Sequence, residues 1–314
     1  MELVDIERSI IKKYRKQIWS PFIKAIKEFE LINDGDKVAV AISGGKDSLL
    51  LAKVIEELHK HSKVDFDVVY ISMDPGYDPR NREQLEKNLE YLGIDGQIFE
   101  TEVFKIAEEV SKGEYPCYMC ARMRRGSLYS KAQELGCNKI ALGHHMNDVI
   151  ETIMLNVLYA GKFNTMKPKL KAQNFENMEL IRPFYYVKEE DIIKWRDYVE
   201  LFALNCACTV TKSQEAYTRK MIKQMIAQMK EKNPEVEMSI LRSGENVNCD
   251  MVVGYQLHGQ KHSFLEEFDD WVFKSINLIH CWRYYRIFAS IIYWPPYFGK
   301  WICKTRPARI FKCL

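Results

Sequence analysis

Residues 38–50, VAVAISGGKDSLL, decide the fold of this chain. A short apolar run over residues 38–42 is followed by a polar turn and then by apolar residues at helical spacing, which predicts a strand, a tight turn and a helix. Two adjacent glycines let the backbone turn sharply, and the unpaired N–H groups of the new helix point into the turn. With a lysine and two serine hydroxyls they predict a site for phosphate or pyrophosphate. The candidate residues are Ser43, Gly44, Gly45, Lys46, Asp47 and Ser48.

The spacing excludes two better-known phosphate loops. The turn lacks the Walker spacing, G-x-x-x-x-G-K followed by Ser or Thr, and it lacks the dinucleotide spacing G-x-G-x-x-G. The hexapeptide SGGKDS, residues 43–48, instead resembles the pyrophosphate loop of the N-type ATP pyrophosphatases, which split ATP between its α and β phosphates. An ordinary strand-to-helix turn with a serine cap is the alternative interpretation.

Predicted strands alternate with predicted helices along the chain. This alternation predicts an α/β fold, a twisted parallel sheet with helices on both faces, as in Rossmann-like domains. We expect an N-terminal helical arm over residues 1–36, a nucleotide-binding domain with a cysteine site and C-terminal helices over 37–271, and an unassigned basic, aromatic tail over 272–314. Further strands are predicted at 67–73, 97–102 and 139–142, and helices at 6–29, 82–92, 149–158, 188–198 and 217–230.

Polar residues follow two of these predicted strands. In an open α/β sheet, ligands lie beyond the carboxyl ends of the strands, so Asp74 is placed to contact the nucleotide or a magnesium ion. A plain turn aspartate fits Asp74 equally well. The adjacent His144 and His145 are typical of metal sites, yet sequence neighbours seldom face one ion. We therefore favour a nucleotide-site role for this segment, with Gly143 and with Asp148 near a helix start.

Nine cysteines occur in a chain without a recognisable export signal, which favours metal, cluster or redox use over a disulfide framework. Cys117 and Cys120 form a C-x-x-C motif, and Cys206 and Cys208 form a C-x-C motif. A structural zinc half-site or a buried pair of inert cysteines also fits C-x-x-C. We interpret residues 115–126 as a loop, in which three cations are able to lower a thiolate pKa or meet phosphate: Arg122, Arg124 and Arg125.

Bulk charge does not identify a partner. The formal net charge of +3 hides an asymmetry, because residues 272–314 carry eight Lys or Arg and no acid, whereas residues 1–271 carry 38 basic against 43 acidic side chains. Any nucleic-acid contact must come from local basic patches, such as residues 159–170. The N-terminus leads directly into a charged helical stretch, and no apolar segment is long enough to span a bilayer, so we expect a cytoplasmic protein without membrane contact.

Taken together, the motifs resemble the tRNA 2-thiocytidine synthetases, which are the TtcA-type tRNA-cytidine 2-sulfurtransferases. The resemblance covers residues 5–270. Asn147 stands where these proteins usually carry an aspartate, and the C-x-C spacing differs from that of many relatives. The motifs, in chain order, are SGGKDS at 43–48, CYMCARMRRG at 117–126, ALGHHMND at 141–148, MKPKL at 166–170, IRP at 181–183 and the late cysteine.

The resemblance implies a chemistry and its residues. In the family, three cysteines hold a 4Fe-4S cluster and leave one iron open for sulfur, which implies Cys117, Cys120 and Cys208 here, with Cys206 as the close alternative to Cys208. ATP and Mg²⁺ are the other expected ligands. The C2 carbonyl oxygen of a cytidine, expected at position 32 of the anticodon loop, attacks the α phosphorus, and sulfur then displaces AMP. The residues expected to be catalytic are Lys46, Asp47, Cys117, Cys120 and Cys208.

Partners and competing functions follow from the same resemblance. It implies tRNA and a sulfur donor such as a cysteine desulfurase as partners, and it is compatible with a homodimer. The alternatives are a tRNA 2-thiouridine synthetase of the same superfamily, a lysidine-type ligase, and a non-catalytic iron–sulfur or zinc protein that binds RNA. Ligation needs no cysteines, and the intact SGGKDS turn argues against a protein without catalysis.

Overall fold

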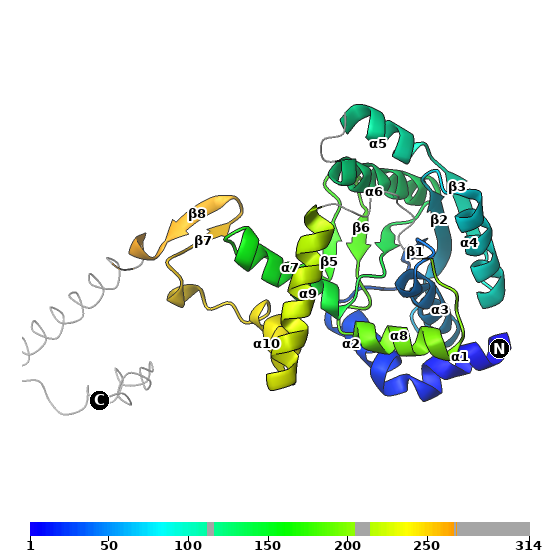
Figure 1. Ribbon diagram of the computed structural model, residues 1–314, viewed down its shortest axis with the longest axis horizontal. Coiled ribbons are helices and arrows are strands. Elements are labelled where there is room, and N and C mark those ends of the chain that lie inside the picture. The colour runs from blue at the N-terminus through cyan, green and yellow to red at the C-terminus, as the bar shows by residue number, and fades with distance from the viewer. Residues whose placement is uncertain (112–115, 205–213, 267, 269–314) are drawn as a thin grey trace, which may run out of the picture. The chain divides into compact units, whose positions relative to one another are not determined.

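The computed structural model describes residues 1–111, 116–204, 214–266 and 268 (Figure 1). The chain forms two compact units, Met1–Asn246 and Val247–Leu314. Two groups of residues with sequence predictions lie outside the described part: the late cysteines Cys206 and Cys208, and the tail 272–314.

The first unit is built on a six-stranded sheet (Figure 1). Its strands are β1 (Lys37–Ile42), β2 (Asp67–Asp74), β3 (Gly96–Glu100), β4 (Lys139–Ala141), β5 (Lys169–Lys171) and β6 (Glu179–Ile181). The order across the sheet is β3-β2-β1-β4-β6-β5, with parallel neighbours from β3 to β6 and β5 antiparallel to β6. The predicted α/β class with a parallel sheet is therefore confirmed. Sequence reasoning misses β5 and β6, because three residues are too few to show a period of two.

Helices cover both faces of this sheet. Alternate residues of β1 point to opposite faces. Val38 and Val40 pack into an apolar cluster with residues of α3 (Lys46–His61), whereas Ala39 and Ala41 pack into a second cluster with Ala132 of α6 (Pro116–Glu134). The other helices that follow the arm are α4 (Pro79–Leu92), α5 (Val103–Ser111), α7 (Met146–Tyr159), α8 (Glu189–Tyr198), α9 (Gln214–Lys232) and α10 (Val236–Ser243).

The N-terminal arm is helical, as predicted, but its pitch changes twice. Two π-helical turns, Ser9–Lys13 and Arg15–Trp19, lie between α1 (Leu3–Arg8) and α2 (Ser20–Glu28). The N–H of Tyr14 accordingly bonds the carbonyl of Ser9 five residues earlier, at 2.8 Å. Each π turn shifts the helix phase, and the arm still buries Ile6, Ile10, Ile18 and Phe22 completely.

The second unit is described up to residue 268. It contains a 3-10 turn, Cys249–Met251, and an antiparallel hairpin of β7 (Gly254–Leu257) and β8 (Gln260–Ser263). His258 and Gly259 form the turn with φ of 50° and 82°, the left-handed backbone that a two-residue hairpin loop requires. Within the part of the chain that the structure describes, no helix is long and apolar enough to cross a membrane.

We predict that Phe22→Ala destabilises the sheet domain by about 3–5 kcal/mol, because Phe22 is fully buried and its ring contacts those of Trp19 and Phe184. Urea unfolding of the full chain, followed by tryptophan fluorescence, measures the loss. Val4→Ala in the same arm is the control, since Val4 is 60% exposed and should change stability by less than about 0.5 kcal/mol. Equal effects of the two changes would show that the arm does not share the core.

Candidate nucleotide-binding and catalytic site

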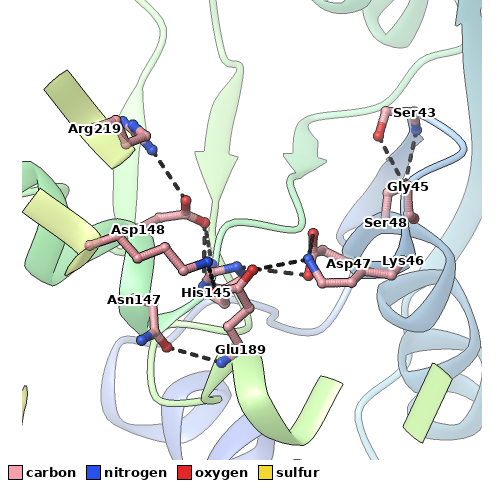
Figure 2. Close-up of polar contacts among 11 residues, drawn as sticks. Ser43, Gly45, Lys46, Asp47, Ser48, His145, Asn147, Asp148, Glu189 and Arg219 are labelled. Atoms are coloured by element: carbon pink, nitrogen blue, oxygen red, sulfur yellow. Dashed lines mark hydrogen bonds and ion pairs between the residues drawn. The ribbon is translucent and has the colours of Figure 1, made fainter. Parts of the chain in front are cut away.

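The SGGKDS turn joins the end of β1 to the start of α3 and is held by its own serines (Figure 2). The backbone N–H of Ser43 donates to Oγ of Ser48 at 3.1 Å, and the Ser48 hydroxyl donates to the Gly45 carbonyl at 2.9 Å. The predicted strand, turn and helix are confirmed. The first N–H groups of α3 have no acceptor within the helix, so the turn presents them to a ligand together with the positive end of the helix dipole.

Two glycines allow the backbone to pack closely at this turn. Gly44 has φ of 78°, and a Cβ there would lie 2.6 Å from Cδ1 of Leu204. Gly143, which follows β4, lies against the turn from the neighbouring strand. A Cβ on Gly143 would be 3.0 Å from the backbone carbonyl carbon of Asp47 and 3.0 Å from the backbone nitrogen of Ser48. The two predicted loop segments therefore meet at one edge of the sheet.

A cavity of about 640 Å³ opens beside the turn and is lined by residues of the β1–α3 turn, the β4–α7 segment and helices α6, α7, α8 and α9. Its lining brings together Ser43, Lys46, Asp47, Ser48, Gly143 and Asp148 from the sequence prediction. Six cations face four carboxylates in it. The cations are Lys46, Arg124, Arg125, Arg219, Lys220 and Lys223, and the carboxylates are Asp47, Asp148, Glu151 and Glu189.

Glu189, the first residue of α8, connects the turn to α9. Its Oε1 lies 3.3 Å from Nζ of Lys46 (Figure 2). Its Oε2 pairs with Lys223. Burial opposes ionisation of Glu189, but the Lys223 hydrogen bond and the nearby cations outweigh it and lower the pKa. Sequence reasoning misses Glu189 because its partners lie 143 and 34 residues away. The acidic first turn of the predicted helix is the signal that could have pointed to it.

The start of α7 is held by Asp148. Its Oδ2 accepts the backbone N–H of His145 at 3.0 Å, and its Oδ1 lies 3.3 Å from Nη1 of Arg219 on α9. Asn147 accepts the backbone N–H of Glu189 at 2.9 Å and donates to Glu237 at 3.2 Å. An amide therefore serves both a donor and an acceptor role where an aspartate would supply acceptors only.

Two further groups in the cavity have strongly shifted pKa values. Burial lowers the pKa of His144 to about 4, so this imidazole is neutral near pH 7 despite the nearby Asp148. Burial raises the pKa of Glu151 to about 7, against the opposing effect of Arg219. Such shifts are typical of functional sites.

Asp74 has a turn role in the structure. Its Oδ1 accepts the backbone N–H groups of Gly76 and Tyr77 at 2.9 Å and 2.7 Å, and its Oδ2 lies 2.8 Å from Nη1 of Arg82. Burial opposes ionisation of Asp74, but these hydrogen bonds prevail and its pKa is lowered. Met73, and not Asp74, lines the cavity. These contacts agree with the interpretation of Asp74 as a plain turn aspartate.

The first cysteine pair lies in a helix, and the interpretation of residues 115–126 as a loop is wrong, because α6 begins at Pro116. Cys117 and Cys120 stand three residues apart in its first turns, and Cys120 is half-buried. One turn further along, Arg124 and Arg125 line the cavity. Across the described residues no group of three or more His, Cys, Asp or Glu forms a metal site, and Cys206 and Cys208 lie outside them.

This fold and turn define a PP-loop protein. The family model of the PP-loop domain matches residues 15–230. Among solved structures the chain is similar to the U34-tRNA thiolase NcsA from Methanococcus maripaludis, whose structure holds its 4Fe-4S cluster. The TM-score is 0.58 at 24% sequence identity, over 72% of this chain and 77% of that chain. At that identity the likeness shows the fold alone.

Curated relatives identify the family within the PP-loop class. The chain is 38% identical to the tRNA-cytidine(32) 2-sulfurtransferase of Aeromonas hydrophila over 234 residues, which are 74% of this chain and 76% of that protein. It is 36% identical to the enzyme of that name from Geobacter sulfurreducens over 233 residues, 74% of this chain and 90% of that protein. The chain belongs to the tRNA-cytidine(32) 2-sulfurtransferase family, which confirms the resemblance given by its motifs.

We predict that Gly143→Ala weakens ATP binding at least about tenfold, because the new methyl group would press on backbone atoms of the SGGKDS turn and displace the start of α3. Equilibrium binding of a fluorescent ATP analogue measures the effect. Gly126→Ala is the matched control, since a Cβ at Gly126 meets nothing within 4 Å. Equal nucleotide affinity of the two variants would contradict the close approach of Gly143 to the turn.

Proposed function

We propose that this chain is an ATP-dependent tRNA-cytidine 2-sulfurtransferase, which adenylates the C2 oxygen of cytidine 32 in a tRNA and replaces that oxygen by sulfur. The relatives at 36–38% identity act, by name, on cytidine 32, which favours cytidine over uridine. The single observation that carries the proposal is the SGGKDS turn at the start of α3, open to a cation-rich cavity. That turn also disfavours a protein without catalysis.

The residues present fit a nucleoside triphosphate. The unpaired N–H groups at the start of α3 and the hydroxyls of Ser43 and Ser48 suit phosphate oxygens, and Gly44 and Gly45 leave room for them. Oδ1 of Asp47 is buried, accepts no hydrogen bond from the described residues and lies 3.8 Å from Nε2 of His145, so it is available to Mg²⁺ or to a hydrogen-bond donor of the nucleotide rather than to its phosphate oxygens. When ATP is bound, its phosphates compete with Glu189 for Lys46.

The first half reaction follows from this placement. The C2 oxygen of the base forms a bond to the α phosphorus while the bond from that phosphorus to the bridging oxygen of pyrophosphate breaks. Negative charge grows on the leaving pyrophosphate, where Lys46 and the α3 N–H groups offset it. Mg²⁺ bound with ATP would supply further neutralisation of the phosphates. In the second half reaction sulfur bonds to C2, and AMP leaves with the former C2 oxygen.

The cysteine pair fits a cluster in residue type and position. Cys117 and Cys120 would be two ligands on α6, and Cys120 lies four residues before Arg124, which is about 6 Å of helix. We propose Cys208 as the third ligand, with Cys206 as the alternative. When bound, a 4Fe-4S cluster supplies the sulfur-carrying chemistry of the second half reaction. Arg124 and Arg125 follow in the same helix and line the cavity, so they would place cations near the nucleotide.

The remaining assignments are proposals of the same kind. A cysteine desulfurase or a similar sulfur donor would feed the second half reaction, and the enzyme would work in the cytoplasm, as a homodimer compatible with the family resemblance. The division into an arm over residues 1–36, a catalytic domain over 37–271 and a tail over 272–314 stays a prediction. Asp74 would influence the nucleotide through the turn that it holds after β2.

We predict that the purified, reconstituted chain releases pyrophosphate from ATP with tRNA that carries cytidine 32 and not with tRNA that carries uridine there, and that 2-thiocytidine then appears in nucleoside mass spectra. Lys46→Ala should lower the pyrophosphate rate roughly 100–1,000-fold, because charge on the leaving group loses its partner. Lys87→Ala, an exposed lysine of α4, is the control. Formation of 2-thiouridine, or undiminished release by Lys46→Ala, would overturn the proposed reaction.

We predict about four irons per chain after anaerobic reconstitution. The iron should be lost in Cys117→Ala, Cys120→Ala and Cys208→Ala and retained in Cys206→Ala. Cys137→Ala is the control, because Cys137 is buried in the apolar cluster beneath α6 and burial raises its pKa. Iron, sulfide and zinc analysis distinguishes the possibilities, and stoichiometric zinc without iron would exclude the cluster.

A further inference from the structure

The α7 side of the cavity contains a carboxylate that adenylation as described does not use. Glu151 lines the cavity and is only 5% exposed. Within the described part of the chain its carboxylate accepts no hydrogen bond, and its one ion pair joins Oε2 to Nη1 of Arg219 at 3.7 Å. Burying a carboxylate with so loose a partner is costly, because the charged form loses most of its water and gains few donors. A hydrogen-bond donor of a substrate in the cavity would therefore find a free acceptor in Glu151.

Charged groups from three helices surround Glu151. Arg219 and Lys223 on α9 favour its ionised form, whereas Asp148 on α7 and Glu189 on α8 oppose it. Burial is the largest influence and raises the pKa to about 7. A donor from the substrate would favour the carboxylate further, so the group is suited to accept a hydrogen bond at neutral pH.

The two pyrimidines differ at the atom that such a carboxylate distinguishes. Cytosine carries an exocyclic N4 amine, which donates hydrogen bonds, where uracil carries a carbonyl oxygen, which accepts them. Glu and Asp accept from the cytosine N4 amine. The same carboxylate faces only lone pairs on the C4 oxygen of uracil, so it would both favour cytosine and reject uracil.

We propose that Glu151 is the base-recognition residue of this cavity and accepts a hydrogen bond from the N4 amine of the target cytosine, with Arg219 holding its carboxylate in place. The inference rests on the proposed function and assigns the wall of the cavity that reads the base. The SGGKDS turn handles phosphate, and α7 with α9 handles the pyrimidine. The target base, extruded from its stack, would lie between the two.

The same contact assists the reaction. As the C2 oxygen bonds to the α phosphorus and pyrophosphate leaves with the electron pair of the broken P–O bond, the neutral base acquires one positive charge. That charge is delocalised through the ring onto N4. A carboxylate at N4 gains interaction energy as the charge develops, so Glu151 would stabilise the transition state more than the bound substrate.

The test compares Glu151→Gln with the wild-type chain on three tRNAs assembled by ligation, which carry cytidine, uridine or pyrimidin-2-one riboside at position 32. Pyrimidin-2-one keeps the C2 carbonyl and lacks the amine. We expect Glu151→Gln to lower tRNA-dependent pyrophosphate release about 10–100-fold with cytidine, as for a hydrogen bond to a charged group. With pyrimidin-2-one the two enzymes should release pyrophosphate at rates within about threefold of each other. The ratio of the loss with cytidine to the loss with pyrimidin-2-one isolates the contact with the amine.

The matched control is Glu57→Gln. Glu57 is 2% exposed, lies on α3 outside the cavity lining and pairs with Lys60 and His61. Its change should therefore leave the ratio of pyrophosphate release with cytidine to that with pyrimidin-2-one unaltered. Equal losses with both bases would assign Glu151 a structural role and overturn the inference. A wild-type chain that releases no pyrophosphate with any of the tRNAs would overturn the proposed function and this inference with it.

A second measurement does not depend on any variant. Binding of the wild-type chain to the cytidine and pyrimidin-2-one tRNAs is compared in the presence of α,β-methylene-ATP, whose P–C bond prevents adenylation. We expect the tRNA without the amine to bind about tenfold more weakly. Equal affinities would overturn the inference while leaving the proposed function intact.

Discussion

The N–H groups at the start of α3 have no acceptor within their own helix, and the site is arranged around that constraint. The helix begins directly at the carboxyl end of β1, so its positive end faces the edge of the sheet where β4 also ends. Gly143 lets the segment after β4 come within van der Waals contact of the turn. Any side chain there would separate the two segments. The phosphate site therefore depends on a helix end and on a backbone-to-backbone contact, with the serines fixing the turn.

One of the carboxylates in this cavity reduces the stability of the fold at neutral pH. Glu189 is held between Lys46 and Lys223, whereas Glu151 is buried with a loosely placed partner. A pKa of about 7, against the ordinary glutamate value of 4.5, means that folded Glu151 holds its proton more tightly than the unfolded chain does. Its favourable contribution is complete below about pH 4.5 and is lost as pH rises through about 7. The native state carries this ionised group at neutral pH at the expense of stability, as functional sites commonly do.

The parts of the fold that follow from local sequence were predictable. The run VAVAISGGKDSLL specifies a strand, a turn and a helix within 13 residues, and its glycines and serines act on near neighbours. Long-range pairings were not predictable, because the partners of Glu189 and Arg219 are set by packing of α7, α8 and α9. The π turns at Ser9–Lys13 and Arg15–Trp19 could not be predicted from a simple helical period either, because each adds one residue to a turn. The interpretation of residues 115–126 as a loop is wrong from Pro116 onward, where Cys117 and Cys120 lie in α6.

Under the proposed function, the cavity would separate two tasks by secondary structure. Phosphate recognition would come from a turn and a helix end, which present backbone groups that any nucleoside triphosphate satisfies. Base recognition requires side chains that distinguish a donor from an acceptor, and such side chains stand on α7 and α9, where Glu151 and Arg219 face the same space. Changes on these helices can alter the base without disturbing the phosphate turn, whereas changes at Gly44 or Gly143 would affect every substrate alike. Glu189 bridges the two regions through Lys46 and Lys223, so binding of ATP phosphates to Lys46 would free one oxygen of Glu189 and change the charge beside α9. Under the proposed function, the nucleotide and the base would therefore be coupled through one carboxylate, which gives a reason for an acidic helix start where a phosphate site alone would need only cations.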